Sequence, residues 1–391
     1  MKKCIICIIM FSIFQLNIGN IFVFALNDIS QVVSLPNNVI NAKSAILMEA
    51  STGEIFYELN KDAKLPIASV TKIMTMLLVM EAIDFGKIKM DDMVKTSENA
   101  ASMGGSQVYL KPNEVMSVKD LLKGVAVSSG NDCAVALAEH ISGSESTFVE
   151  LMNRRIEEIG AKNTHFTNCN GLSENGDHYS TAHDVALMSK ELLKHSEIHD
   201  FLTIWTDSLR NGEFSLSNTN RLVRFYEGAN GIKTGSTSVA KYCLSASAKR
   251  GNMQLISVIL GAPTSSERFE GAAKLLDFGF ANFSLVDDSV LDNESLPSIK
   301  VRKGHEDFVE TTLDGKINYI VKKGNNDRIK KDVKVEKFVN APVNKGDKIG
   351  EIIFSLDGKE IGRKNVVCKN SISRITFFET FIKLTVAWMN F

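Results

Sequence analysis

Hydrophobic and polar positions change their spacing several times along this 391-residue chain, and each change predicts a different element. Two apolar-rich runs at 44–49 and 54–59 are separated by an Ala-Ser-Thr-Gly turn, which predicts a β-hairpin. The run that begins at Ser69 is apolar on all sides and rich in straight-chain residues, which is typical of a buried helix. Apolar stretches at 118–127 and 132–141 predict two more helices joined by a short loop.

Further along, the spacing predicts a second hairpin and a covering helix. Strand-like runs at 241–249 and 253–261 are joined by the turn residues Arg-Gly-Asn. The segment 266–280 then has the spacing of an amphipathic helix. Hairpins at both ends, with helices between them, predict an α+β domain over residues 26–282, in which one antiparallel sheet is covered by helices.

From residue 283 onward the pattern consists of short alternating runs punctuated by Asp-Gly and Gly-Asp turns, which predicts a separate β-rich domain over residues 283–368. Residues 369–391 place polar and apolar side chains on opposite sides of a helix beginning near residue 372. Such a helix is expected to lie in a membrane interface rather than to cross the membrane. The alternative is a helix docked on the β-rich domain.

Residues 1–25 have the pattern of a secretory signal peptide. Lys2 and Lys3 are followed by an apolar run at 5–14 and by small residues at the cleavage position near Ala25. An uncleaved anchor is the alternative, but polar residues interrupt the run well short of the roughly 20 residues that a bilayer needs. We therefore expect an exported, extracytoplasmic protein attached peripherally to the cell membrane by its C-terminal helix.

Composition narrows the possible partners and the expected cofactors. The 45 Lys and Arg nearly balance the 46 Asp and Glu, so no global charge attracts nucleic acid, and none is expected as a partner. His195 and His199 are one helical turn apart, but without a third ligand we expect neither a metal nor a cofactor. The cysteines of the mature chain are widely spaced, so we expect mostly free, buried thiols at Cys133, Cys169, Cys243 and Cys368.

Three short motifs carry the candidate chemistry: S-V-T-K at 69–72, S-G-N at 129–131 and K-T-G at 233–235. Alone, S-x-x-K usually marks a helix start and S-G-N an ordinary turn. Their joint occurrence in this order is what favours a catalytic interpretation. It points to a serine nucleophile with a nearby lysine rather than to metal-dependent chemistry.

Ser69 is the candidate nucleophile and Lys72 its candidate base. A serine hydroxyl needs a base to take its proton, and the spacing puts Lys72 one turn along on the same face of the predicted helix. Lys72 must be neutral to act, so we expect burial and a second cation such as Lys233 to lower its pKa.

The other motif residues have candidate roles around the reacting carbonyl. Backbone N–H groups of Ser69 and Ser236 would form an oxyanion hole if the strand carrying K-T-G runs beside the helix start. Gly235 would let the substrate backbone approach that strand. Ser129 would relay a proton to the leaving amine and Asn131 would hold the substrate amide. Lys233 and Thr234 are suited to a substrate carboxylate.

The motifs in their contexts, A-S-V-T-K-I-M-T, S-G-N-D-C-A and N-G-I-K-T-G-S-T, together with N-G-L at 170–172, resemble those of one family. The chain is similar to the D-alanyl-D-alanine carboxypeptidases of the low-molecular-mass penicillin-binding proteins, which are related in fold to the serine β-lactamases. The resemblance covers nearly the whole chain, including the signal peptide, the β-rich domain and the terminal helix.

The resemblance implies that the chain removes the terminal D-alanine from peptidoglycan stem pentapeptides and is inhibited by β-lactam antibiotics. It implies Ser69 as the acylated nucleophile, Lys72 as base, Ser129 as proton relay and Asn131 as a ligand of the substrate amide. Residues implied to flank or bind the peptide are Lys233, Thr234, Gly235, Ser236 and Arg268, the last through the terminal carboxylate.

Two departures leave the outcome of the reaction open. Ser236 stands where some family members have histidine, and the E-x-x-L-N context of a deacylating glutamate is not evident, so slow deacylation of a bound penicillin is expected. The alternatives are a β-lactamase or D,D-endopeptidase of the same fold, or a peptidoglycan-binding protein without catalytic activity.

Overall fold

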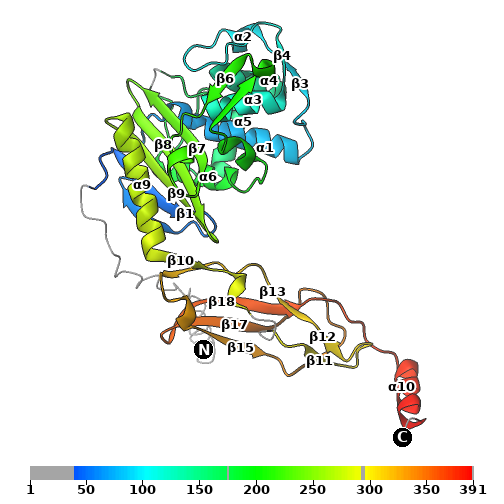
Figure 1. The fold of residues 1–391 in the computed structure, drawn as a ribbon. Coiled ribbons are helices and arrows are strands. Elements are labelled where there is room, and N and C mark those ends of the chain that lie inside the picture. Colours follow the sequence, from blue (N-terminus) through cyan, green and yellow to red (C-terminus); the bar gives the residue numbers. More distant parts are fainter. Residues whose placement is uncertain (1–38, 174–175, 292–295, 390–391) are drawn as a thin grey trace, which may run out of the picture. The chain divides into compact units, whose positions relative to one another are not determined.

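The structure is a computed structural model that describes residues 39–173, 176–291 and 296–389. The predicted signal peptide at 1–25 lies outside these residues. Within them, the order of helices and strands follows the α+β pattern expected from the sequence, with a mixed region up to about residue 282 and a strand-rich region after it (Figure 1).

The mixed region is built on one five-stranded antiparallel sheet with the strand order β2-β1-β9-β8-β7. Both predicted hairpins are confirmed, because β1 pairs with β2 and β8 with β9. The strand that carries K-T-G, β7, lies at one edge, so one side of it has no neighbouring strand in this sheet. The strands are β1 (Ser44–Glu49), β2 (Ile55–Leu59), β7 (Ala229–Thr237), β8 (Lys241–Arg250) and β9 (Met253–Ala262).

Helices pack against this sheet and bury its central strands (Figure 1). The helix α9 (Ser265–Asn282) packs on β8 and β9, while α6 (Ala182–Leu192) also contacts β9 and in turn packs against α1 (Lys72–Asp84). Because both faces of the central strands are covered, β8 and β9 are nearly continuously buried.

The predicted buried helix is confirmed in α1, but its start differs from the expectation. Ser69 lies in a 3-10 turn, η1 (Ala68–Thr71), and the α-helix begins only at Lys72. The reason is local: Ala68 has φ of 49°, a left-handed conformation that cannot continue a right-handed helix backwards.

The remaining helices of the mixed region pack around α1 and position the loops of the site. The predicted helix pair is confirmed in α3 and α4, with Asn131 as the first residue of α4 rather than part of the loop. The helices are α2 (Glu98–Ala101), α3 (Val118–Ser128), α4 (Asn131–Ser142), α5 (Glu145–Glu158), α7 (Ile198–Leu202) and α8 (Leu222–Phe225). Two small hairpins pair β3 (Met93–Lys95) with β4 (Val115–Ser117) and β5 (Thr206–Leu209) with β6 (Phe214–Ser217).

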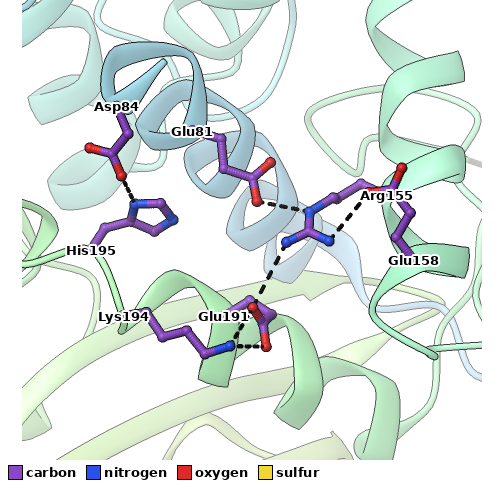
Figure 2. Close-up of polar contacts among 7 residues, drawn as sticks. All are labelled: Glu81, Asp84, Arg155, Glu158, Glu191, Lys194 and His195. Carbon is purple, nitrogen blue, oxygen red and sulfur yellow. Dashed lines mark hydrogen bonds and ion pairs between the residues drawn. The ribbon is translucent and has the colours of Figure 1, made fainter. Parts of the chain in front are cut away.

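Charged side chains connect the C-terminal end of α1 to α5 and to the end of α6 (Figure 2). Arg155 Nε donates to Glu81 Oε1 at 2.8 Å, and its Nη2 lies 3.8 Å from Glu191 Oε2. His195 Nδ1 lies 2.6 Å from Asp84 Oδ2. Because Arg155, Glu81 and Glu191 are only partly exposed, their contacts fix how the three helices meet at this end more firmly than fully exposed pairs would.

The strand-rich region has an apolar core of its own, centred on side chains such as Ile352, Phe354 and Val366, which are fully buried. Its sheets have the orders β13-β18-β17-β15, β12-β11-β16 and β10-β14. The strands are β10 (Phe283–Val286), β11 (Ile299–Arg302), β12 (Phe308–Val309), β13 (Thr311–Leu313), β14 (Tyr319–Lys322), β15 (Ile329–Val335), β16 (Phe338–Asn340), β17 (Lys348–Leu356) and β18 (Lys359–Cys368). The domain boundaries themselves stay a prediction.

The last described element is a helix, α10 (Phe377–Met389), which begins later than expected. Ile372, where the sequence predicted the helix to start, is buried and exchanges backbone hydrogen bonds with Val343, so it belongs to the strand-rich region. Phe377 and Trp388 expose more than four-fifths of their surface. No helix within the described ranges combines the length and apolar character needed to cross a membrane.

Candidate active site

Ser69 and Lys72 meet as the motif spacing predicted. The amine nitrogen of Lys72 lies 3.0 Å from Ser69 Oγ, within hydrogen-bond range. The turn η1 brings them together, because Ser69 belongs to it and Lys72 follows it immediately. Proton transfer between the two groups therefore needs no rearrangement of the backbone.

The amine of Lys72 has two further neighbours, both of which accept hydrogen bonds. It donates to Asn131 Oδ1 at 2.5 Å and to the backbone oxygen of Asn170 at 2.7 Å. Neither carbonyl oxygen can donate a proton. In the neutral amine, its two N–H groups are held by these carbonyls, so the lone pair is directed at the hydroxyl of Ser69.

Burial lowers the pKa of Lys72 to about 7. The side chain is fully enclosed, and removing an ammonium group from water disfavours its charged form. Lys233 is also buried, and its pKa is lowered well below the usual range by that burial, then by the charges of Lys72 and Arg268. A substantial fraction of Lys72 is thus neutral near neutral pH, as a general base requires.

Ser129 lies at the C-terminal end of α3 with φ of 64°, in the left-handed region that few serines adopt. Its side chain is buried, and its Oγ has no hydrogen-bond partner among the described residues. A buried hydroxyl without a partner is energetically unfavourable, and such groups often mark functional sites. The role of this hydroxyl as a proton relay stays a prediction.

The side chain of Asn131 bridges two parts of the site. Its Oδ1 accepts from Lys72, and its Nδ2 donates to the backbone oxygen of Gly104 at 2.7 Å. The next residue, Asp132, fixes the same loop, because its buried carboxylate accepts from the backbone N–H of Val108 at 3.0 Å. Sequence reasoning did not identify this role of Asp132, although the residue directly follows the S-G-N motif.

Gly235 allows the strand β7 to approach the turn η1 closely. A Cβ at this position would lie 2.5 Å from the backbone oxygen of Ile67 and 3.0 Å from the backbone nitrogen of Ser69. The expectation that this glycine serves substrate approach is thus incomplete, because its bare Cα already faces the protein's own turn. The condition set for an oxyanion hole, that the K-T-G strand runs beside the helix start, is met.

The side chains of Lys233 and Thr234 are both buried, and each donates a hydrogen bond to another group of the protein. Lys233 Nζ donates to the backbone oxygen of Thr234 at 3.0 Å. Thr234 Oγ1 donates to Thr219 Oγ1 at 2.7 Å. Their proposed contacts with a substrate carboxylate stay a prediction, as does the contribution of the Ser236 N–H to an oxyanion hole.

Arg268 reaches β7 from the start of α9 and is almost fully buried. Its Nη1 donates to the backbone oxygens of Gly235 and Cys243, at 3.2 and 3.3 Å. The guanidinium also lies over the ring of Phe269, and burial lowers its pKa to about 10. Arg268 is thus brought to the site through backbone contacts, while binding of a substrate carboxylate stays a prediction.

The described residues contain no group of side chains that could hold a metal ion. His195 pairs with Asp84, and His199 Nε2 is bonded to the backbone oxygen of Leu193, so the two histidines do not converge. Cys133, Cys169, Cys243 and Cys368 are free and buried, as predicted.

Comparison with known proteins extends over both regions. The family described as D-alanyl-D-alanine carboxypeptidase matches residues 30–264, and the C-terminal domain of penicillin-binding protein 5 matches residues 288–374. Over 355 residues the chain is 47% identical to the D-alanyl-D-alanine carboxypeptidase DacF of Bacillus subtilis, covering 90% of each chain. It is 35% identical over 356 residues to DacC of Escherichia coli, covering 89% of this chain and 88% of the relative.

Solved structures of penicillin-binding proteins are also similar to this chain. Penicillin-binding protein 5 of Haemophilus influenzae superposes with a TM-score of 0.75 at 35% identity, covering 88% of this chain and all of the other. Penicillin-binding protein D2 of Listeria monocytogenes, solved in an ampicillin-bound form, covers 63% of this chain and all of its own at 32% identity and a TM-score of 0.58. The chain belongs to the D-alanyl-D-alanine carboxypeptidase family.

Proposed function

We propose that this chain removes the terminal D-alanine from peptidoglycan stem pentapeptides through an acyl-enzyme on Ser69, and that penicillins acylate the same residue. The observation that carries the proposal is the Lys72 amine. It is buried, has a pKa of about 7 and lies 3.0 Å from Ser69 Oγ. The curated relatives are named as D-alanyl-D-alanine carboxypeptidases, which supports the same reaction.

In the acylation step, Ser69 Oγ attacks the carbonyl carbon of the penultimate D-alanine while its proton moves to the lone pair of Lys72. The oxyanion that forms accepts hydrogen bonds from the backbone N–H groups of Ser69 and Ser236. As the C–N bond breaks, the proton held by Lys72 moves to Ser129, and Ser129 passes its own proton to the leaving amine of D-alanine. The closeness of β7 to η1 supports the first assignment, and the hydroxyl of Ser129, which has no hydrogen-bond partner in the described part of the chain, supports the second.

The substrate peptide lies along β7, whose outer edge has no partner strand in the main sheet. Addition of an extended peptide to such an edge is a common mode of peptide recognition. Lys233 and Thr234 bind the terminal carboxylate, aided by the positive charge of Arg268, and Asn131 contacts the substrate amide. Water then hydrolyses the acyl-enzyme. Because the deacylating-glutamate context is missing from the sequence, a penicilloyl adduct should be hydrolysed slowly.

The place of action follows from the same proposal. Peptidoglycan lies outside the cytoplasmic membrane, so the chain is exported by its N-terminal signal and attached to the outer face of the membrane by α10. The exposed aromatic side chains of α10, Phe377, Phe378 and Trp388 among them, support a location in the membrane interface.

To test this function, the mature protein is incubated with benzylpenicillin, and its intact mass and the concentration of free antibiotic are followed over hours. A long-lived adduct of one drug molecule that maps to Ser69, and is missing in Ser69→Ala, is expected. Release of D-alanine from a stem pentapeptide by the wild type alone completes the assignment. Rapid loss of antibiotic with a fleeting adduct would instead identify a β-lactamase, cleavage of cross-linked muropeptides would identify an endopeptidase, and no adduct would indicate a silent binding protein.

A further inference from the structure

We propose that His178 is a positioning residue for the acylation reaction, acting on the oxyanion-binding N–H of Ser69 through the side chain of Thr71. The proposal deepens the function proposed above and rests on it. His178 lies in none of the three motifs, and no step of the reaction described above uses it. It is nevertheless buried directly behind the turn that carries Ser69.

Both ring nitrogens of His178 are engaged, and their partners determine the tautomer. Nδ1 lies 3.1 Å from the backbone nitrogen of Thr167, which can only donate, so Nδ1 is an acceptor without a proton. The neutral ring must then carry its proton on Nε2, which lies 2.7 Å from Thr71 Oγ1. Burial lowers the pKa of His178 to about 4, which keeps the ring neutral near neutral pH.

Thr71 transmits this restraint to the residue before the nucleophile. Since Oγ1 accepts from His178 Nε2, its own proton is directed to the backbone oxygen of Ala68, 2.8 Å away. The peptide group between Ala68 and Ser69 is planar and trans, so its carbonyl and its N–H point in opposite directions. Holding the oxygen of Ala68 therefore fixes the direction of the Ser69 N–H.

This restraint matters because the backbone at Ala68 is strained. Its φ of 49° is one that alanine rarely adopts, so the turn needs contacts that hold it. A second contact on the same carbonyl comes from Gly171, where a Cβ would lie only 1.9 Å from the oxygen of Ala68. The peptide that presents the Ser69 N–H is thus held between the Thr71 hydroxyl and the loop at 167–171.

The other nitrogen of His178 holds that loop. Thr167, which donates to Nδ1, begins the segment in which the backbone oxygen of Asn170 accepts from Lys72. One imidazole therefore joins the turn bearing the nucleophile to the loop that orients the base. Substitutions that keep only one of its two contacts can separate these effects.

His178→Gln and His178→Asn provide that separation. The terminal amide nitrogen of glutamine can take the place of Nε2 and donate to Thr71, whereas the amide oxygen of asparagine can take the place of Nδ1 and accept from Thr167. The measured quantity is the second-order rate constant for acylation by benzylpenicillin, read from intact mass, with the urea midpoint of unfolding measured in parallel. We expect His178→Asn to acylate at least about tenfold more slowly and His178→Gln to stay within about threefold of the wild type.

Thr71→Val tests the same path without touching the histidine, and it decides the matter if His178→Asn does not fold. It should slow acylation by about tenfold or more, and combining it with His178→Asn should add little further loss. Thr75→Val is the matched control. It removes a buried hydroxyl one turn further along α1, bonded to the backbone oxygen of Cys169 in the same loop, and should leave acylation within about threefold.

Thr71→Val with wild-type acylation would overturn the proposal. So would equal losses in His178→Gln and His178→Asn that follow the unfolding midpoint, because they would show a purely structural role. A wild-type protein that takes no drug would contradict the proposed function instead, so the two failures are distinguishable.

Discussion

The two regions of the molecule bury different kinds of side chains. In the mixed region, the buried groups include Lys72, Asp132, Lys233 and Arg268, whereas among the described residues after 282 every buried side chain is apolar or a cysteine. Burying a charged group is costly unless it is paired, and an apolar core avoids this cost. Around Ser69 the mixed region carries this cost, and there it yields a lysine with a pKa of about 7.

The largest change in acylation rate is expected when the buried lysine is replaced. Lys72→Ala removes the base from Ser69, so the rate of penicillin acylation should fall by about 10²–10⁴-fold. Intact-mass kinetics measure the loss. Cys133→Ala is the control, since this thiol is equally buried but takes no part in the proposed reaction, and it should acylate near the wild-type rate. Equal labelling of wild type and Lys72→Ala would refute the assignment of the base.

A substitution in the apolar core of the strand-rich region should lower the stability of the protein and leave its acylation rate unchanged. Phe354→Ala removes a fully buried ring, and the expected loss in free energy of unfolding is about 3–5 kcal/mol. Denaturant unfolding measures this. The acylation rate per folded molecule should not change, because Ser69 and its partners lie in the other region. A loss of acylation in protein that is still folded would show that the two regions are coupled.

The pH dependence of acylation sharpens the comparison further. Only neutral Lys72 accepts a proton, and its pKa is about 7, so the acylation rate should rise with pH, about tenfold per unit below pH 7, and level off above it. Single-turnover measurements between pH 5 and 9 provide the profile. A plateau that extends down to pH 5 would mean that another group acts as the base.

The smallest catalytic effect is expected at the C-terminus. Deleting residues 376–391 removes α10 and leaves the buried Ile372 in place, so folding and acylation should be unchanged. The protein should move from the membrane fraction to the soluble fraction in cell fractionation. Continued membrane attachment of the truncated protein would rule out α10 as the anchor.

Local sequence signals predicted most of the strands and helices. The hairpins β1–β2 and β8–β9 were predictable because in each of them two apolar-rich runs lie close together in the chain, with turn residues between them. The predicted start of α10 was too early, because Ile372 forms a backbone bridge with Val343. The spacing of apolar residues along the sequence does not reveal this partner.

Sequence reasoning named the members of the candidate site, whose roles stay a prediction, but it did not give most of their contacts. The spacing of Ser69 and Lys72 was sufficient, since a single turn separates them, although this turn is 3-10 rather than α-helical. The left-handed Ala68, the bridge made by Asn131 and the position of Gly235 against the turn all depend on segments far apart in the chain. His178 was not identified as a site residue because its role depends on a contact with Thr71, 107 residues earlier.

The position of β7 at the sheet edge has a consequence for solubility. An exposed edge strand can pair with the edge of another molecule, and proteins often prevent such aggregation with an inward-pointing charge or a covering segment. β7 has a covering segment in the turn η1, which lies against Gly235. The close approach of η1 that shapes this strand for one short peptide therefore also disfavours its pairing with a second molecule.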